Sequence, residues 1–262
     1  MLDLSTVGVE RVEQLLETDN LAAHLTRLTN QTQTRHNLRS VRLLPPIERQ
    51  EVWAAGVTYM RSKTARMEES SFSATAYDKV YEAPRPELFF KSLADKVVPS
   101  GEPVGIRKDG CWNVPEPELG LVINSKGKIM GFTIGNDMSS RDIEGENLLY
   151  LPQAKVYSRS CALGPVITLG TLEAEARTWT IRIRVQRDTS VVFQGETSVG
   201  QIKRSFSELV SYLFRSQSFP HGVVLLTGTG IVPPDKFTLQ VGDNIQINIS
   251  GIGTLENSVV MV

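Results

Sequence analysis

Residues 113–137 read NVPEPELGLVINSKGKIMGFTIGND and contain the pattern that decides the fold. Two apolar runs flank a turn at residues 125–127, which predicts a β-hairpin with glycine in its turn. Residues two apart in a strand point to the same face, so Glu116 and Glu118 are expected to lie side by side. Asp137 ends the second run, and the hairpin can bring it back beside the start of the first.

These three acids predict a metal site. Carboxylates held this close in a half-buried place resist ionisation, and a bound cation removes the conflict. Carboxylate oxygens suit a hard ion, Mg²⁺ or alternatively Mn²⁺, better than they suit zinc. Solvated acids at strand ends are the alternative, and the spacing alone does not separate the two. The acids and arginine that crowd residues 137–146 after an apolar strand favour a site.

The whole-chain composition excludes several classes of protein. Of the 262 residues 40% are hydrophobic, and 28 Lys and Arg nearly balance 29 Asp and Glu, so nothing favours nucleic acid or an anionic membrane as a partner. No apolar stretch approaches the length of about 20 residues that spans a bilayer. The two cysteines, Cys111 and Cys161, form neither a disulfide framework nor a zinc motif. We expect a soluble protein of the reducing cytoplasm.

Helical patterns occupy three segments. Residues 9–28 and 201–216 carry apolar side chains at helical spacing. Residues 64–82 are polar, rich in helix formers and free of helix-breaking residues, and they follow the segment around Tyr59. This segment is expected to be an exposed helix, either fixed or acting as a lid over a site.

Strands dominate the remainder without a repeating βαβ rhythm. Residues 179–197 alternate apolar and polar side chains around a turn at residues 187–189, which predicts a second hairpin. The pattern favours an α+β fold with a mixed sheet. The Pro45–Pro46 pair interrupts regular structure, so we divide the chain into a small N-terminal region, 1–48, and a catalytic domain, 49–262.

Five motifs in a fixed order resemble the fumarylacetoacetate hydrolase superfamily over roughly residues 50–262. The motifs are PEPELGLVI (115–123), GFTIGNDMSSRDIE (131–144), AKVYSRSCALGPVI (154–167), LLTGTG (225–230) and GDNIQINISGIGTLENSV (242–259). The resemblance implies a mixed β-sandwich roll around a divalent metal, usually Mg²⁺, in a homo-oligomer (dimer or tetramer). It also implies chemistry on 2-keto or 1,3-dicarbonyl acids: C–C hydrolysis, decarboxylation, isomerisation or dehydration.

The resemblance assigns roles to matching residues. It implies Glu116, Glu118 and Asp137 as metal ligands. It places the family's motif lysine at Lys155 and its substrate-facing threonine at Thr229. A domain that binds metal without catalysis would not need to keep the last two.

The chain departs from the family's hydrolases around residues 56–63, GVTYMRSK. Tyr59 matches, but Ser62 or Lys63 stands where a histidine that activates water is expected, and the chain's three histidines lie elsewhere. Histidine is the commonest general base near neutral pH, so its absence counts against hydrolysis. Tyr59, Arg61 and Lys63 are expected to bind substrate, although Arg61 and Lys63 could equally be surface charges.

A second departure is Glu87 in RPELFFK (85–91), where many relatives carry an apolar residue. Both departures fit the branch of the family that dehydrates 2-keto-3-deoxy sugar acids such as 2-keto-3-deoxy-D-arabinonate, giving 2,5-dioxopentanoate and water. Glu87 and Lys155 are then the candidate acid and base, in either order. An acylpyruvate or fumarylacetoacetate-type C–C hydrolase and a 2-oxo acid decarboxylase are the alternatives, and a surface glutamate is the alternative for Glu87 itself.

Three further expectations concern charged residues. Arg141 and Asp142 are expected to orient Asp137 from behind. Lys91 is expected to be solvated or to contact an anion. Lys155 could instead form a Schiff base with a 2-keto acid, although three metal-binding carboxylates already supply an electron sink.

Overall fold

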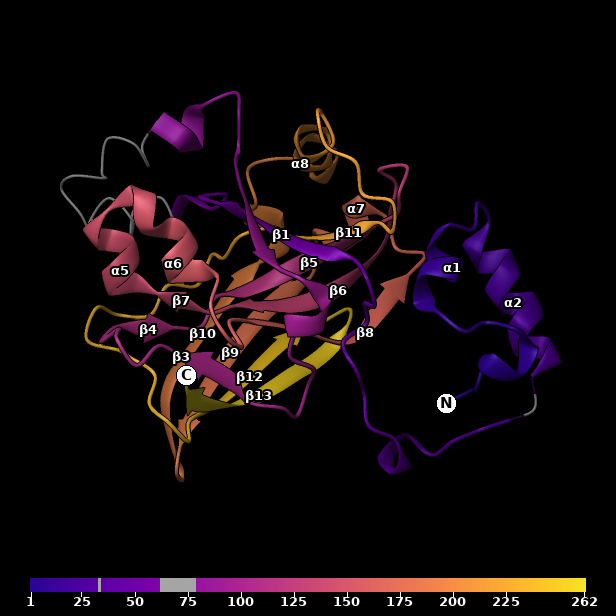
Figure 1. The fold of residues 1–262 in the computed structure, drawn as a ribbon, viewed down its shortest axis with the longest axis horizontal. Coiled ribbons are helices and arrows are strands. Elements are labelled where there is room, and N and C mark those ends of the chain that lie inside the picture. Colours follow the sequence, from indigo (N-terminus) through magenta and orange to yellow (C-terminus); the bar gives the residue numbers. More distant parts are fainter. Residues whose placement is uncertain (33, 62–78) are drawn as a thin grey trace.

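The computed structural model describes residues 1–32, 34–61 and 79–262. Two β-sheets pack against each other, and short helices surround them (Figure 1). The α+β class and the mixed roll predicted from the sequence are confirmed. No helix in these residues is long and apolar enough to cross a membrane.

The larger sheet has six strands in the order β2-β1-β11-β5-β6-β8. They are β1 (Glu51–Gly56), β2 (Glu87–Ser92), β5 (Pro117–Ile123), β6 (Ile129–Asp137), β8 (Cys161–Leu169) and β11 (Val223–Leu226). β1 and β11 are parallel, and the other neighbours are antiparallel. A strand from late in the chain therefore separates β1 from β5.

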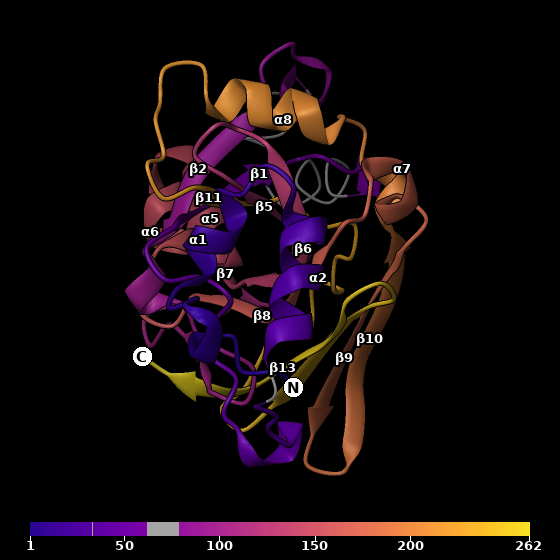
Figure 2. The same ribbon diagram turned by 90° about the vertical axis from the view of Figure 1, so that its right-hand side faces the viewer.

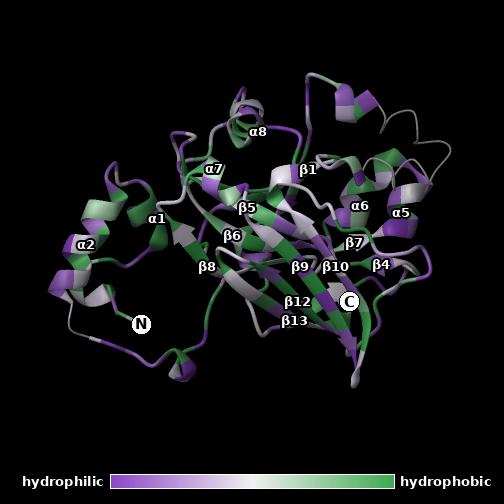
Figure 3. Cartoon of the chain, turned by 180° about the vertical axis from the view of Figure 1, so that it is seen from behind, coloured by the Kyte–Doolittle hydropathy of each residue, from purple (hydrophilic) through white to green (hydrophobic). Residues whose placement is uncertain are grey.

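The second sheet has five strands in the order β10-β9-β12-β13-β3, and β4 and β7 form a separate pair. Their bounds are β3 (Val104–Ile106), β4 (Asn113–Val114), β7 (Ser139–Ser140), β9 (Thr180–Arg187), β10 (Ser190–Ser198), β12 (Asn244–Ile249) and β13 (Gly253–Met261). Only β13 and β3 pair in parallel among these strands. Hydrophobic and hydrophilic residues alternate along β9 (Figure 3), which has one buried and one solvated face.

The main core lies between the two sheets. Leu121 and Phe132 from the larger sheet meet Ile183 and Ile247 from the smaller one, and each is almost completely buried. Burying one such side chain stabilises the fold by about 1.5–3 kcal/mol. This layer holds the larger sheet rigidly, and that sheet carries the acids of residues 116–137.

Both predicted hairpins are confirmed. β5 and β6 pair around residues 124–128, where the Asn124 side chain accepts hydrogen bonds from the backbone of Lys126 and Lys128. β9 and β10 pair around Asp188, whose φ of 51° lies in the left-handed region that aspartate tolerates in turns.

The helices are short. They are α1 (Val12–Leu16), α2 (Leu21–Gln31), α5 (Arg141–Glu146), α6 (Leu151–Lys155), α7 (Glu173–Ala176) and α8 (Phe206–Leu213), with 3-10 turns η1 (Ser5–Val7), η2 (Leu38–Ser40), η3 (Ala94–Lys96), η4 (Leu148–Tyr150) and η5 (Val199–Gln201). The helix predicted over 201–216 is α8, which begins where Ser205 caps the backbone of Glu208. The helical pattern over 9–28 corresponds to two helices, α1 and α2, because Asn20 caps a new helix. Residues 62–78, most of the segment considered as a lid, lie outside the described residues.

The N-terminal helices cover the outer face of the larger sheet (Figure 2). Leu16 and Leu21 pack with Val122 and Leu226, which alternate along their strands with residues of the main core. α1 and α2 lie at the opposite end of the molecule from α5 and α6 (Figure 1). The division of the chain at residue 48 remains a prediction.

Candidate active site

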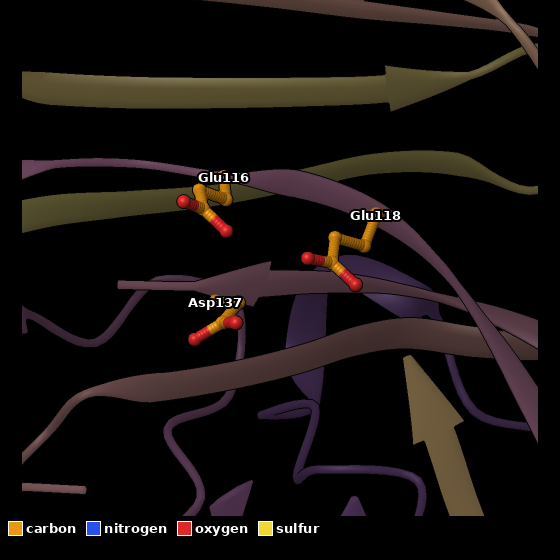
Figure 4. A group of neighbouring side chains, drawn as sticks. All are labelled: Glu116, Glu118 and Asp137. Atoms are coloured by element: carbon orange, nitrogen blue, oxygen red, sulfur yellow. The ribbon is translucent and has the colours of Figure 1, made fainter. Parts of the chain in front are cut away.

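Glu116, Glu118 and Asp137 converge at the open end of the β5–β6 hairpin (Figure 4). Glu118 lies opposite Gly135 in the sheet, and the Asp137 amide donates to the Glu116 carbonyl at 3.0 Å. One carboxylate oxygen from each residue lies within 4.8 Å of the others, and all three side chains are buried. The hairpin thus brings together the three acids that the sequence predicted to meet.

Lys155 reaches this cluster from the last turn of α6. Its Nζ donates to Glu116 at 2.7 Å, to Asp137 at 3.1 Å and to the Ser139 hydroxyl at 2.6 Å. The side chain is 2% exposed. The three acceptors around this one nitrogen match in number the three donors of an ammonium group.

Lys91 is a second buried lysine, and the expectation that it is solvated is wrong. Its Nζ lies 2.5 Å from Asp137 Oδ1 and donates to the backbone carbonyls of Met138 and Lys155. Lys91 is the extra residue of a β-bulge in β2, and bulges re-aim side chains. Strand alternation was a usable signal, because Glu87 and Lys91 lie four residues apart on one strand.

Glu118 has the least compensated charge of the three acids. Burial raises its pKa well above the ordinary carboxyl value, and the like charges of Asp137 and Glu116 raise it further. Lys155 and the Gly228 amide, which donates to Glu118 at 2.6 Å, oppose that shift. Without another positive charge nearby, the ionised form of Glu118 is therefore costly to bury.

Arg141 and Asp142 do not act together on Asp137 as expected. The guanidinium of Arg141, 2% exposed, pairs with Glu116 at 3.0 Å and lies 3.6 Å from Glu144. Asp142 instead accepts hydrogen bonds from the backbone of Cys111 at 2.6 Å and from the Ser140 hydroxyl at 2.8 Å. Arg141 thus supports another ligand, and Asp142 ties the start of α5 to the loop before β4.

Charge and donor chemistry both fit a divalent metal ion. The pocket is lined by five carboxylates, Glu87, Glu116, Glu118, Asp137 and Glu144. Three cations contact them: Lys91, Lys155 and Arg141. Among the described side chains the carboxylates of the pocket outnumber these cations, and a dication suits such a cluster. The ligand atoms of the buried triad are all oxygen, which favours Mg²⁺ or Mn²⁺ over zinc.

The pocket around the acids is narrow. Its walls come from the ends of β1 and β2, the carboxylate cluster, α5, α6 and the Gly228–Thr229 turn. About 10 Å³ of free space remains between them, roughly the room that one water needs. Glu87 and Thr229 line the pocket, as expected. Glu144 also lines it, and the sequence reading did not assign it a role.

The other expected substrate contacts lie elsewhere. Tyr59 is 1% exposed, packs in the main core and does not line the pocket, so its contact with substrate stays a prediction. Arg61 is exposed and does not line the pocket. Lys63 lies outside the described residues.

The chain's histidines are remote from the pocket. His36 pairs with Asp3, His24 contacts Arg27, and His221 lies 3.6 Å from Glu13. None of them lines the pocket among the described residues. The carboxylates and lysines are therefore the groups available for moving protons there.

A search with family models finds one that covers most of the chain. The model described as the C-terminal domain of fumarylacetoacetate (FAA) hydrolase matches residues 51–260. The chain belongs to the fumarylacetoacetate hydrolase family. The matched span includes the converging acids, Lys155 and Thr229, so the residues taken from the resemblance lie inside the family domain.

Two curated members of the fumarylacetoacetate hydrolase family are similar over long spans. A probable 2-keto-3-deoxyxylonate dehydratase from Haloferax volcanii is 45% identical over 99% of this chain and 90% of its own length. A 2-dehydro-3-deoxy-D-arabinonate dehydratase from Saccharolobus solfataricus is 40% identical over 83% of this chain and 74% of its own.

A solved structure of the family has the same fold. It is a 2-keto-3-deoxy-D-arabinonate dehydratase complexed with magnesium and 2,5-dioxopentanoate. It superposes with a TM-score of 0.81 at 36% identity, and the match covers 94% of this chain and 90% of that one.

Proposed function

We propose that the chain is a Mg²⁺-dependent dehydratase of 2-keto-3-deoxy sugar acids such as 2-keto-3-deoxy-D-arabinonate, forming 2,5-dioxopentanoate and water. The observation that carries the proposal is the buried triad of Glu116, Glu118 and Asp137 sharing one pocket with Lys155 and Glu87. The two dehydratase relatives and the magnesium-containing structure support the same assignment.

Glu116, Glu118 and Asp137 would hold the metal. Bound Mg²⁺ supplies a Lewis acid for the 2-keto oxygen, which makes the C3 protons of the substrate more acidic. Arg141 keeps Glu116 in place, and Lys91 does the same for Asp137. These partners fix the positions of the ligands before the metal arrives.

Glu87 takes the C3 proton. Its carboxylate lines the pocket from the first residue of β2, and it is only partly buried, so it can exchange protons with solvent. The C3–H electrons form the C3–C4 double bond, while the C4–O bond breaks and its electron pair leaves on the hydroxyl oxygen. The resulting C5 alcohol reaches the aldehyde of 2,5-dioxopentanoate by tautomerisation, in which C5 and its hydroxyl oxygen each lose a proton and C3 and C4 each gain one.

Lys155 gives a proton to the departing C4 hydroxyl, so that water leaves. Its ammonium group is positioned by Glu116, Asp137 and Ser139 within the metal pocket. The same contacts oppose the Schiff-base alternative, because a nitrogen with three hydrogen-bonded protons has no lone pair for a carbonyl. Each proton transfer is typically worth 10²–10⁴-fold in rate.

Thr229 contributes a substrate contact from the turn after β11. Its hydroxyl lines the pocket and is held by the backbone of Ile231. Arg61 and Lys63 remain candidates for the substrate carboxylate, which their positive charges would attract.

The test is a substrate panel with the purified protein. With Mg²⁺ it should convert 2-keto-3-deoxy pentonates to the aldehyde product, followed by NMR, and a chelator should abolish the conversion. Acylpyruvates should undergo little C–C cleavage, and 2-oxo acids should release little CO₂. Rapid metal-dependent release of pyruvate or CO₂, with no dehydration, would replace this proposal with the hydrolase or the decarboxylase.

The assembly and the compartment are also part of the proposal. We expect a homo-oligomer, a dimer or tetramer, on the strength of the family resemblance, and light scattering of the purified protein measures it. A cytoplasmic location is supported by two unpaired cysteines, Cys111 exposed and Cys161 buried. Fractionation of cells that express the chain measures that.

A further inference from the structure

The position of the Glu87 carboxylate depends on a glycine in the neighbouring strand. Gly56, the last residue of β1, lies directly opposite Glu87 in the antiparallel β1–β2 pair. A Cβ built on Gly56 would lie 2.1 Å from Glu87 Oε2 and 2.6 Å from its Cδ. No real Cβ approaches another atom so closely, so the carboxylate occupies the space that a side chain at position 56 would fill.

The backbone does not explain why position 56 is glycine. Gly56 is not in the left-handed region, so its conformation is open to other residues. The three heavy atoms nearest to the added Cβ all belong to the Glu87 side chain. By contrast, a Cβ at Gly228 would meet a backbone carbonyl as well as Thr58. Substitution at Gly56 therefore displaces the flexible Glu87 side chain first, because its atoms are the three nearest to the added Cβ.

Both residues line the pocket that contains Glu116, Glu118 and Asp137. A carboxylate that folds back over its strand partner stays at the wall of this pocket. If the place over Gly56 is filled, the carboxylate must swing along or away from β2. A displacement of about 1 Å can cost up to 10²-fold in rate when a reacting group must be positioned.

We infer that Gly56 is a positioning residue of the dehydratase site, because its missing side chain lets the Glu87 carboxylate lie back over β1 beside the metal ligands. This rests on the proposed function, in which Glu87 takes the C3 proton. Gly56 has no side chain that could act on the substrate, so we expect its effect to pass through Glu87.

The kinetic test uses Gly56→Ala. Its kcat should fall about 10-fold to 10²-fold, whereas Mg²⁺ affinity, KM and thermal stability should stay close to wild type. Gly145→Ala is the matched control: its Cβ would meet nothing within 4 Å, and it lies beside the same pocket in α5. Its kcat should not change.

A double-mutant cycle separates positioning from general disturbance. In a Glu87→Ala background, Gly56→Ala should cause no further loss, because the group it displaces is gone. A full additional loss in that background would overturn the inference. So would wild-type kcat in Gly56→Ala when Glu87→Gln is inactive, and that result would leave the proposed function intact. Wild-type kcat in Glu87→Gln would instead remove Glu87 from the mechanism, and this inference with it.

A crystal structure of Gly56→Ala tests the same point without activity. It should show the Glu87 carboxylate displaced from its place over β1, with Glu116, Glu118 and Asp137 unmoved. An unchanged Glu87 conformation, with the strands parted to admit the alanine, would overturn the inference whatever the enzyme's substrate.

Discussion

The β5–β6 hairpin has a charged cluster at each end, and the two clusters differ in balance. At the open end, Glu118 shares a buried pocket with like charges and lacks a full counter-charge. At the turn end, Glu17 accepts from the amide and hydroxyl of Ser125, and Glu13 accepts from the Arg49 guanidinium through both oxygens. The turn end, which docks the N-terminal helices, is complete by itself. The open end becomes complete only with a cation.

The difference shows how function can be read from an uncompensated charge. Burying a charge without a partner is expensive, so folded proteins pair such groups or neutralise them. Glu13 and Glu17, at the turn end of the hairpin, follow that rule. The pocket gathers more carboxylates than cations among the described side chains, and such a cluster favours a dication.

The largest expected effect is the loss of metal binding at the open end. Glu118→Gln should abolish Mg²⁺ binding and with it activity, because a neutral amide is a poor ligand for a hard dication. Removing the buried like charge should leave the metal-free fold as stable as wild type or more so. Calorimetric titration with Mg²⁺ measures this, and Glu146→Gln, an exposed acid of α5, is the control. Wild-type Mg²⁺ affinity in Glu118→Gln would contradict the ligand assignment.

The next effect concerns proton transfer. Lys155→Met and Glu87→Gln should each lower kcat by 10²–10⁴-fold, about 3–5 kcal/mol of barrier, while Mg²⁺ and substrate still bind. The two losses should not add fully, since proton removal and hydroxyl departure belong to one elimination. Lys126→Met, an exposed lysine, serves as control.

Trapping experiments decide between the acid role of Lys155 and the Schiff base. Borohydride added with substrate should leave Lys155 unmodified, and activity should vanish without Mg²⁺. A covalent adduct on Lys155, together with activity that survives chelation, would favour the imine.

Lys91 should matter for stability at the same end. Lys91→Met removes the buried partner of Asp137 and should cost about 3–5 kcal/mol of unfolding free energy without metal, the usual cost of breaking a buried pair. The cost should be smaller with saturating Mg²⁺, because the dication compensates the same carboxylate. Urea unfolding with and without Mg²⁺ measures both values. As a control, Lys96→Met at an exposed position should change either unfolding free energy by less than about 0.5 kcal/mol. If Lys91→Met costs the same with and without Mg²⁺, Lys91 and the dication do not compensate the same carboxylate.

The smallest effect belongs to the turn end. Glu13→Gln should cost about 1 kcal/mol, because Arg49 is half exposed and its pair with Glu13 is weakly stabilising. It should leave kcat and Mg²⁺ affinity unchanged, as should the exposed Glu10→Gln. A change in Mg²⁺ affinity would show that the two ends are coupled.

The two ends should also respond to pH with opposite sign. Arg49 lowers the pKa of Glu13, so this stabilisation is present above the ordinary carboxyl pKa and is lost as the pH falls. The raised pKa of Glu118 means that the metal-free fold loses stability as the pH rises above the ordinary carboxyl range. Thermal unfolding against pH measures both. Glu13→Gln should reduce the loss of stability at acidic pH, and Glu118→Gln should reduce the loss of stability at higher pH. Stability profiles identical to that of the wild type would contradict both assignments.

Local pattern in the sequence was enough to predict that the three acids meet. Alternation places Glu116 and Glu118 on one face of a strand, and a short glycine turn returns Asp137 beside them. The α+β class, both hairpins and α8 follow from the same short-range periodicities. Lys155 and Thr229 came from the family resemblance, since no spacing connects them to the triad.

Only the tertiary structure decided which charges surround the triad. Lys91 contacts Asp137 from a bulge in β2, and β2 shares a sheet with the acids because β1 and β11, the latter from late in the chain, pair between it and β5. Tyr59 matched a motif, yet the sheet packing places it in the core. The sequence determines on which side of a strand each residue projects. Which residue becomes its partner across the sheet depends on pairings between segments more than a hundred residues apart. The set of charged side chains around Glu116, Glu118 and Asp137 is a property of those pairings.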